Sequence, residues 1–316
     1  YTEIDGECYY QSDLDVLQDF INNSSETIDM DMDDNQDGNI DPLELGDQIW
    51  DALGRLTSLD CYYSYNDNCQ LSGSIPESIG SLTSLTTLDL QGTSYTWATA
   101  NNFTGSIPES IGSLSSLNYL YLQYNDLTGS IPESIGSLSS LNYLYLQYND
   151  LTGSIPESIG NLTSLQYLYL YQNDLSGSIP ESIGNLSSLN YLYLYDNHLG
   201  CYEYDLNSDT CITHCDDTDA CSGSIPASIA NSGLSSYDIL KLADNELSGV
   251  IPESICDLNL NWYHSTYFTI TNNRLCPPYP ECIEGYMGTQ DTENCDYTPT
   301  CDEGYEAINI YCYYSS

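Results

Sequence analysis

Oxygen-bearing side chains are concentrated in one short stretch near the amino terminus. Residues 33–44 read DDNQDGNIDPLE, with Asp33, Asn35 and Asp37 at alternate positions and Glu44 at the end. Carboxylate and amide oxygens, with no nitrogen or sulfur ligand among them, suit a hard divalent cation such as Ca²⁺. The stretch therefore predicts a calcium-binding loop, and the alternative is an acidic turn that binds no ion.

The spacing in this stretch resembles the calcium loop of EF-hand proteins at each diagnostic position. The resemblance implies that Gly38 allows the sharp turn and that Ile40 anchors the loop inward. Asn39 would contribute its backbone carbonyl oxygen, and Asp41 would bind the ion directly or through a water molecule. The expected ligands are Asp33, Asn35, Asp37, Asn39, Asp41 and Glu44.

The segments on either side of the loop predict how it is held. Before it, apolar residues recur at helical spacing between positions 14 and 21, and Ser12 is expected to cap that helix. After it, residues 45–53 are expected to form an exiting helix. Apolar residues alternate over 28–32, so the entering side differs from a standard EF-hand. We therefore predict a calcium loop and not a paired calcium sensor.

Motifs of catalysis are not found in the sequence. His198, His214 and His264 lie in separate contexts. No GxSxG, HExxH or P-loop pattern occurs, and serine is abundant because GSIPES recurs. We predict that the chain is not an enzyme.

Thirteen cysteines in so polar a chain indicate an oxidising compartment and disulfide bonds. Four of them fall within an insertion at residues 200–221: Cys201, Cys211, Cys215 and Cys221. His214 beside Cys215 raises a zinc site as an alternative, but an oxidising compartment favours two disulfides.

The remaining cysteines suggest further pairs, although sequence alone does not fix their connectivity. We expect Cys61–Cys69 to close the front of the molecule and Cys256–Cys276 to close its far end. The next expected pairs are Cys282–Cys295 and Cys301–Cys312. Cys8 is then left over, either unpaired or bonded to another chain.

Most of the chain is an internal repeat. Residues 105–128 read GSIPESIGSLSSLNYLYLQYNDLT, and the same 24 residues follow at 129–152. The glycine of GxIP recurs at Gly73, Gly105, Gly129, Gly153, Gly177, Gly223 and Gly249, with insertions in the two longest intervals. A short fixed period is typical of a solenoid, in which each unit buries its apolar face only against its neighbours.

Each unit carries LxxLxLxxNxL followed by GxIP, as in Leu117, Leu120, Leu122, Asn125 and Leu127. This pattern resembles the plant-specific class of leucine-rich repeats and extends over roughly residues 52–275. The resemblance implies an α/β solenoid, a right-handed superhelix of about eight coils with a parallel concave β-sheet and disulfide-stabilised caps.

Three regions are expected on this basis. Residues 1–52 form an N-terminal cap with the calcium loop, residues 53–275 form the solenoid, and residues 276–316 form a Cys-rich tail. The resemblance also implies an internal ladder of asparagines that bond the backbone of the adjacent turn: Asn101, Asn125, Asn149, Asn173, Asn197, Asn245 and Asn273. Cys69 takes that place in the first coil.

Tyrosines alternate with leucines in the repeated strands, so they point away from the core. Stacking the coils places them in two columns, Tyr119, Tyr143, Tyr167, Tyr191 and Tyr121, Tyr145, Tyr169, Tyr193. Eight exposed tyrosines either stabilise neighbouring strands or form a contact surface for a glycan, a peptide or another subunit.

Charge excludes several kinds of partner. Forty-seven acidic residues face three basic ones, Arg55, Lys241 and Arg274, and the formal net charge is −44. This charge repels phosphate backbones and anionic membrane surfaces, so we expect neither nucleic acid binding nor membrane insertion. The sequence begins with Tyr1 and shows no signal peptide, so we expect a processed extracellular chain or a fragment of a longer one.

The two ends of the chain match. Residues 1–12 read YTEIDGECYYQS and residues 305–316 read YEAINIYCYYSS. Three interpretations stay open: a piece of a longer tandem protein, a Cys8 that pairs with another chain, or two copies of a small module that flank the solenoid.

Two functions follow. The first is an extracellular structural protein whose rigid modules join end to end into a filament or array, since a heterologous contact that does not close makes a fibre. The alternative is a cell-surface recognition or adhesion module that binds a glycan or protein, as the resemblance to receptor ectodomains and polygalacturonase inhibitors implies. Candidate N-glycosylation sites are Asn22, Asn23, Asn102, Asn161 and Asn185.

Overall fold

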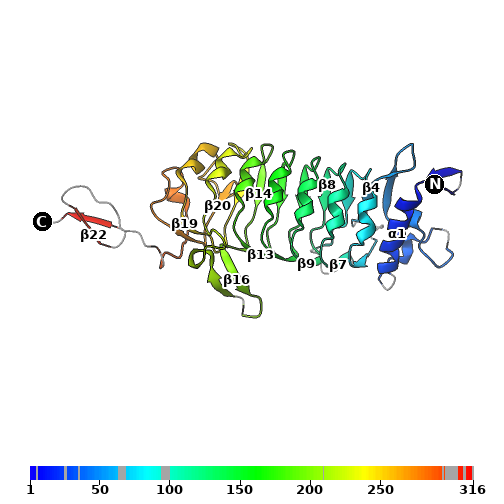
Figure 1. Ribbon diagram of the computed structural model, residues 1–316, viewed down its shortest axis with the longest axis horizontal. Coiled ribbons are helices and arrows are strands. Elements are labelled where there is room, and N and C mark those ends of the chain that lie inside the picture. The colour runs from blue at the N-terminus through cyan, green and yellow to red at the C-terminus, as the bar shows by residue number, and fades with distance from the viewer. Residues whose placement is uncertain are drawn as a thin grey trace.

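The computed structural model describes the chain except residues 5, 25–26, 35, 63–68, 94–99, 209, 294, 296–304, 309–310 and 315–316. Its coils stack in a row that begins beside helix α1 and ends near strand β19 (Figure 1).

An antiparallel pair and one helix precede the coils. Strands β1 (Thr2–Ile4) and β2 (Glu7–Tyr9) lead into α1 (Gln11–Asn23). The predicted apolar stripe is confirmed, because Leu14, Leu17, Phe20 and Ile21 are buried. Ser12 as the cap is wrong: Tyr10 precedes the helix, and its carbonyl accepts hydrogen bonds from Asp13 N and Leu14 N.

Two short 3₁₀ helices follow, η1 (Met30–Met32) and η2 (Pro42–Glu44). The exiting helix expected over residues 45–53 is also wrong, because that segment forms strand β3 (Asp47–Trp50). β3 lies antiparallel to β4 and satisfies the hydrogen-bonding edge that would otherwise end the sheet. Pairing at the sheet edge therefore prevails over the local helical pattern.

A nine-stranded sheet runs along one side of the coils. Its members after β3 are β4 (Leu56–Asp60), β6 (Thr87–Asp89), β8 (Tyr119–Tyr121), β10 (Tyr143–Tyr145), β12 (Tyr167–Tyr169), β14 (Tyr191–Tyr193), β18 (Ile239–Lys241) and β20 (Phe268–Thr269). These eight strands pair in parallel, in agreement with the expected eight coils.

A second, six-stranded sheet was not expected from the sequence. It consists of β5 (Ser72–Gly73), β7 (Asn102–Gly105), β9 (Asp126–Gly129), β11 (Asp150–Gly153), β13 (Asp174–Gly177) and β15 (His198–Leu199). Gly129 ends its strand at φ +74°, a left-handed conformation that favours glycine. This conformation explains the glycine of GxIP in six of the seven repeats, Gly223 being the exception.

The opposite side of each coil is a short 3₁₀ helix that follows the proline of GxIP. These helices are η3 (Glu77–Ser81), η4 (Glu109–Ser113), η5 (Glu133–Ser137), η6 (Glu157–Asn161), η7 (Glu181–Asn185), η9 (Ala227–Asn231) and η10 (Glu253–Leu258). Their glycines pack tightly, because a Cβ on Gly136 would lie 2.3 Å from the Ser158 carbonyl oxygen.

The core is a continuous column of leucine and isoleucine, with an asparagine in each of seven coils. Asn149 is typical: its Oδ1 accepts from Leu127 N at 3.1 Å, and its Nδ2 donates to the carbonyls of Leu122 and Leu146. The implied ladder is present at all seven positions: Asn101, Asn125, Asn149, Asn173, Asn197, Asn245 and Asn273. It satisfies backbone amides that the narrow turns leave without a partner.

The remaining elements lie in the insertion, in the last coils and beyond them. They are β16 (Cys201–Asp205), β17 (Thr210–His214), η8 (Cys215–Asp217), β19 (Ser248–Val250), β21 (Arg274–Cys276), η11 (Glu284–Tyr286), β22 (Tyr305–Ile308) and β23 (Tyr311–Tyr314). Strands β22 and β23 pair in the register of β1 and β2: Glu3 lies opposite Cys8, and Ala307 lies opposite Cys312. The matching ends thus share a backbone pairing, which favours two copies of one small module.

Candidate functional site

The tyrosines of the repeated strands lie in register on the nine-stranded sheet. Tyr143 aligns with Tyr119 and Tyr167, while Tyr145 aligns with Tyr121 and Tyr169. β14 extends both columns to Tyr191 and Tyr193, as the alternation predicts.

A third column lies beside these two and escaped the sequence analysis. Tyr124 stacks on Tyr148 at a centroid distance of 4.3 Å, and Tyr171 stacks on Tyr195 at 4.5 Å. Tyr148 and Tyr171 join the two halves at 5.4 Å, edge to face. The column was missed because Tyr124 and Tyr148 stand one position later in their repeat than Tyr171 and Tyr195. We call these twelve tyrosines the tyrosine surface.

Rings of the tyrosine surface cover one another. Tyr169 lies between Tyr145 at 4.4 Å and Tyr193 at 4.5 Å, with the ring planes within 6° of parallel. Tyr119 and Tyr148 are each 37% exposed, and the other ten tyrosines are less exposed. Of the eight tyrosines expected to be exposed, Tyr119 is exposed and the other seven are half-buried, because stacking covers part of each ring.

Burial makes some phenol groups of this surface harder to ionise. Burial is the main cause that raises the pKa of Tyr145 to about 12, and burial likewise raises the pKa of Tyr171 to about 12. Both of these hydroxyls therefore remain able to donate and to accept a hydrogen bond at physiological pH.

Opposite charges stand at the two ends of the surface. Asp60 and Asp89 continue the column of Tyr121 on strands β4 and β6, and Lys241 continues it on β18. Burial raises the pKa of Asp89 to about 7 and raises the pKa of Asp60. Burial lowers the pKa of Lys241, whose Nζ donates to the Ser265 carbonyl. The surface therefore has two carboxyl groups at one end and a lysine at the other.

Comparison with known families identifies the repeat. A model described as a leucine-rich repeat region matches residues 99–203, and one described as a leucine-rich repeat matches residues 238–258. The chain contains leucine-rich repeats. Neither matching model indicates a catalytic activity. No curated protein matches the chain.

Solved structures of two receptor ectodomains from Arabidopsis thaliana resemble this leucine-rich-repeat protein. The GASSHO1/SCHENGEN3 receptor kinase ectodomain, in complex with CASPARIAN STRIP INTEGRITY FACTOR 2, is 28% identical with a TM-score of 0.56 over 86% of this chain. The HAESA receptor kinase ectodomain, in complex with an extended IDA peptide hormone, is 30% identical with a TM-score of 0.50 over 69% of this chain. This chain spans 30% and 36% of their respective lengths. Within the described residues, no helix is long and apolar enough to cross a membrane.

The predicted calcium loop precedes the leucine-rich repeats. Asp33 accepts hydrogen bonds from Asp37 N at 3.2 Å and Gly38 N at 2.8 Å, and Glu44 Oε2 accepts from Asp41 N at 2.8 Å. Gly38 has φ +91°, which fits the expected sharp turn.

Five of the six expected calcium ligands in this loop are among the described residues. Asn35 lies outside the described residues, and Asn39 donates both its backbone N and its side-chain Nδ2 to Asp37 Oδ1. Among the described residues, no three His, Cys, Asp or Glu side chains gather as a metal site. The donor chemistry fits Ca²⁺, and the ligand set stays a prediction.

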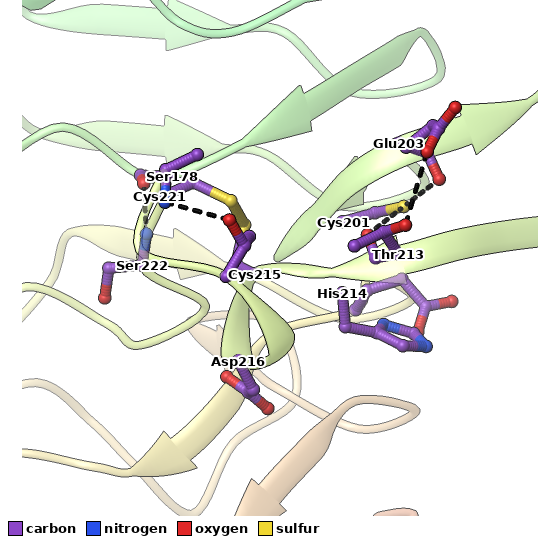
Figure 2. Close-up of a disulfide and its surroundings, with 12 residues drawn as sticks. Ser178, Cys201, Glu203, Thr213, His214, Cys215, Asp216, Cys221 and Ser222 are labelled. Carbon is purple, nitrogen blue, oxygen red and sulfur yellow. Dashed lines mark hydrogen bonds and ion pairs between the residues drawn. A yellow bond between two sulfur atoms is a disulfide. The ribbon is translucent and has the colours of Figure 1, made fainter.

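Disulfides hold both ends of the solenoid. The expected Cys61–Cys69 bond is present, as are two bonds within the insertion, Cys201–Cys211 and Cys215–Cys221. The four cysteines of the insertion thus form two disulfides, and no thiol in the insertion is left to bind zinc. Figure 2 shows the Cys215–Cys221 bond beside His214 and Asp216.

The pairing expected beyond the last coil is wrong. Cys256 bonds to Cys282 and Cys276 bonds to Cys295, in place of Cys256–Cys276 and Cys282–Cys295. β21 carries Cys276 alongside β19, on a different part of the coil from Cys256 in η10, so the two sulfurs do not meet. The Cys301–Cys312 pair lies outside the described side chains. Cys8 is exposed and forms no disulfide with any described residue.

The glycosylation candidates are all exposed: Asn22, Asn23, Asn102, Asn161 and Asn185. Asn23 already donates its Nδ2 to the Ser74 carbonyl at 2.9 Å. The remaining histidine, His264, is exposed in the last turn before β20 and lies apart from the other two.

Proposed function

We propose that this leucine-rich-repeat protein is an extracellular recognition module whose tyrosine surface binds an extended segment of a peptide or protein partner. The observation that carries the proposal is the continuous array of twelve tyrosines in three stacked columns. Aromatic side chains offer large contact area at a low entropy cost, because few rotamers are lost on binding. Stacking fixes the rings before the partner arrives, which lowers that cost further.

Neutral phenols suit a peptide backbone. Each hydroxyl can donate to a carbonyl or accept from an amide, and the ring edges that stacking leaves uncovered can contact an apolar side chain. Related ectodomains have been solved with a peptide hormone and with CASPARIAN STRIP INTEGRITY FACTOR 2, and these complexes support a protein ligand over a glycan.

The charged ends predict the direction and length of the ligand. Five strand steps separate Asp89 on β6 from Lys241 on β18. At roughly 4.8 Å per step they span about 24 Å, which about seven extended residues would cover at roughly 3.4 Å each. We expect a Lys or Arg over Asp60 and Asp89, and a carboxylate near Lys241.

The structural-filament hypothesis has weaker support. The similar ectodomains are described as receptors in complex with ligands, not as filament subunits. The paired hairpins at the two ends remain compatible with a tandem protein, which would present several recognition modules in a row. An oxidised, disulfide-bonded chain fits the extracellular location that we propose.

Selection of peptides tests the proposal. The immobilised protein is screened against a random peptide library, and the Tyr145→Ser/Tyr169→Ser variant serves as the counter-screen. We expect enriched sequences that bind the parent and not the variant, with a basic residue near one end. Enrichment of sequences that bind both proteins equally would contradict the role of the tyrosine surface. A glycan array run in parallel would identify a carbohydrate ligand if the peptide proposal fails.

We also propose that residues 33–44 bind one Ca²⁺ ion and stabilise the N-terminal cap. The support is the oxygen-only donor set in Asp33, Asp37 and Glu44 and the turn at Gly38. An ion that binds only the folded state would add roughly 2.7 kcal/mol of stability at a hundred times its dissociation constant.

A further inference from the structure

A polar cavity of about 700 Å³ lies between the disulfide hairpin β16–β17 and the last coils. The hairpin contributes Tyr204 and His214, the turn after β18 contributes Glu246, and the first residue of β21 contributes Arg274. None of the twelve tyrosines of the tyrosine surface lines this cavity. Its size is that of an ordinary small-molecule site, for which roughly 300–1,000 Å³ is usual.

Groups that can carry positive charge gather in this cavity. The whole chain has three Lys or Arg residues and three His residues. His198, His214 and Arg274, half of those six, line the one cavity. In a chain with a net charge of −44 such a group creates a local exception to the acidic surroundings.

Two of these side chains have buried nitrogens without a hydrogen-bond partner among the described residues: Arg274 Nη1 and His214 Nδ1. The nearest ionic partner of Arg274 Nη1 is Asp216 Oδ2 at 3.9 Å, and that of His214 Nδ1 is Glu246 Oε2 at 3.7 Å. Both distances exceed hydrogen-bond length. Since buried polar groups are normally paired, both nitrogens lack the acceptor that such groups usually have.

The surrounding fold holds these groups in place. Arg274 begins β21, and its backbone N donates to the Leu247 carbonyl at 2.7 Å. His214 ends β17 directly before the Cys215–Cys221 disulfide (Figure 2). His198 stacks against Tyr204 with ring centroids 3.4 Å apart and contacts Asp174 through Nε2. The stacked pair forms a flat aromatic wall.

The side chains that line the cavity limit the kinds of ligand that it can bind. A guanidinium matches a carboxylate, to which it can donate two parallel hydrogen bonds. Asp244, Glu246 and Asp291 line the same cavity and would repel a doubly charged phosphate. They would instead attract an ammonium group. Asp244 already accepts from Asn272 Nδ2 at 2.6 Å, and Asp291 accepts from Glu293 N at 3.1 Å, which leaves Glu246 the least engaged.

We propose that this cavity binds a small zwitterion of the α-amino-acid type. Its carboxylate accepts from Arg274 and His214, its ammonium group faces Glu246, and its side chain packs on the Tyr204–His198 wall. The site is independent of the tyrosine surface, so it holds or fails separately from the function proposed above.

Calorimetric titration with phenylalanine tests the proposal on the intact protein. Phenylalaninamide lacks the carboxylate, N-acetylphenylalanine lacks the ammonium group, and inorganic phosphate probes simple anion binding. We expect phenylalanine to bind, each modified probe to bind at least roughly tenfold more weakly, and phosphate to show no heat. Equal binding of phenylalanine and its amide, or phosphate as the only binder, would overturn the assignment.

Variants separate the site from the fold. Arg274→Gln should weaken phenylalanine binding by roughly tenfold or more, and Arg274→Lys should restore only part of it, because lysine lacks the planar fork. His264→Gln, which alters a histidine outside the cavity, should bind as the parent does. If circular dichroism shows that Arg274→Gln is unfolded, the comparison of the probes on the parent protein is used to accept or reject the proposed site. Unchanged phenylalanine binding in a folded Arg274→Gln protein would refute the proposal.

Discussion

Replacement of Asp89 by Asn should flatten the dependence of stability on pH. Asp89 is only 7% exposed, and its carboxylate accepts from Gln91 N at 3.2 Å and from Gln91 Nε2 at 2.9 Å. Burial nevertheless prevails over these bonds and raises its pKa from 3.8 to about 7. Asp60 on the adjacent strand adds a like charge.

The direction of the effect follows from proton linkage. Between the two pKa values the folded state binds more protons at Asp89 than the unfolded state does, so the free energy of unfolding falls as pH rises. The stabilisation is fully present below about pH 4 and is lost as pH rises through about 7. Between pH 5 and pH 7 the free energy of unfolding falls by somewhat less than two pH units' worth, or about 2.3 kcal/mol, because Asp89 is already half ionised in the folded state at pH 7. The Asn variant carries no proton to lose, so this contribution disappears.

Urea unfolding at pH 5, 6, 7 and 8 measures the difference between the parent and Asp89→Asn. Titration of the other carboxyls is common to both proteins and cancels. Asp126→Asn, which alters an exposed carboxyl of β9, is the matched control. Its free energy of unfolding should depend on pH in the same way as that of the parent. If the free energy of unfolding of Asp89→Asn also depends on pH as the parent's does, the carboxyl of Asp89 is not desolvated and the prediction is refuted.

Three further outcomes are expected. Asn149→Ala leaves the buried Leu127 amide without its acceptor and should lower the free energy of unfolding in urea by roughly 1–3 kcal/mol. Asn161→Ala, which alters an exposed asparagine, should change this free energy little. Equal effects of the two substitutions would argue against the asparagine ladder. Calorimetric titration of the chelator-stripped protein should show one strong Ca²⁺ site that Glu44→Ala abolishes and Asp34→Asn retains, and an absence of heat would refute the site. Non-reducing mass spectrometry of native material should find Cys8 bonded to a cysteine outside residues 1–316 or in a neighbouring copy, and a free thiol in a monomer would exclude both.

Periodicity made the solenoid predictable. A repeat of 24 residues leaves little freedom: Leu120 and Leu122 must face the core, and Asn125 must reach the neighbouring turn. The register of the tyrosine columns follows from stacking alone. These features depend on interactions between identical units, which one unit already specifies.

Features that depend on the ends or on shifted positions were not predictable in this way. Residues 45–53 carry apolar residues at helical spacing, yet β3 forms because β4 needs a partner at the sheet edge. Cys256 and Cys276 are close in sequence, but they belong to different sides of the last coil and bond to Cys282 and Cys295. The third tyrosine column was missed because its members change position within the repeat.

The polar cavity also lay beyond sequence analysis. His198, His214 and Arg274 are separated by many residues, and only the folded insertion brings them together. The sequence shows only that basic residues and histidines are scarce in this acidic chain. That scarcity draws attention to each of them but does not indicate that three of them line one cavity.

The tyrosine surface as a recognition site is tested most directly by one affinity comparison. A peptide selected on the parent is titrated against the parent, Tyr145→Ser/Tyr169→Ser and the control Tyr237→Ser/Tyr263→Ser, whose tyrosines are 79% and 73% exposed outside the surface. Loss of two central anchors should weaken binding by at least roughly tenfold, while the control should bind as the parent does. Equal affinity for all three proteins would contradict the account.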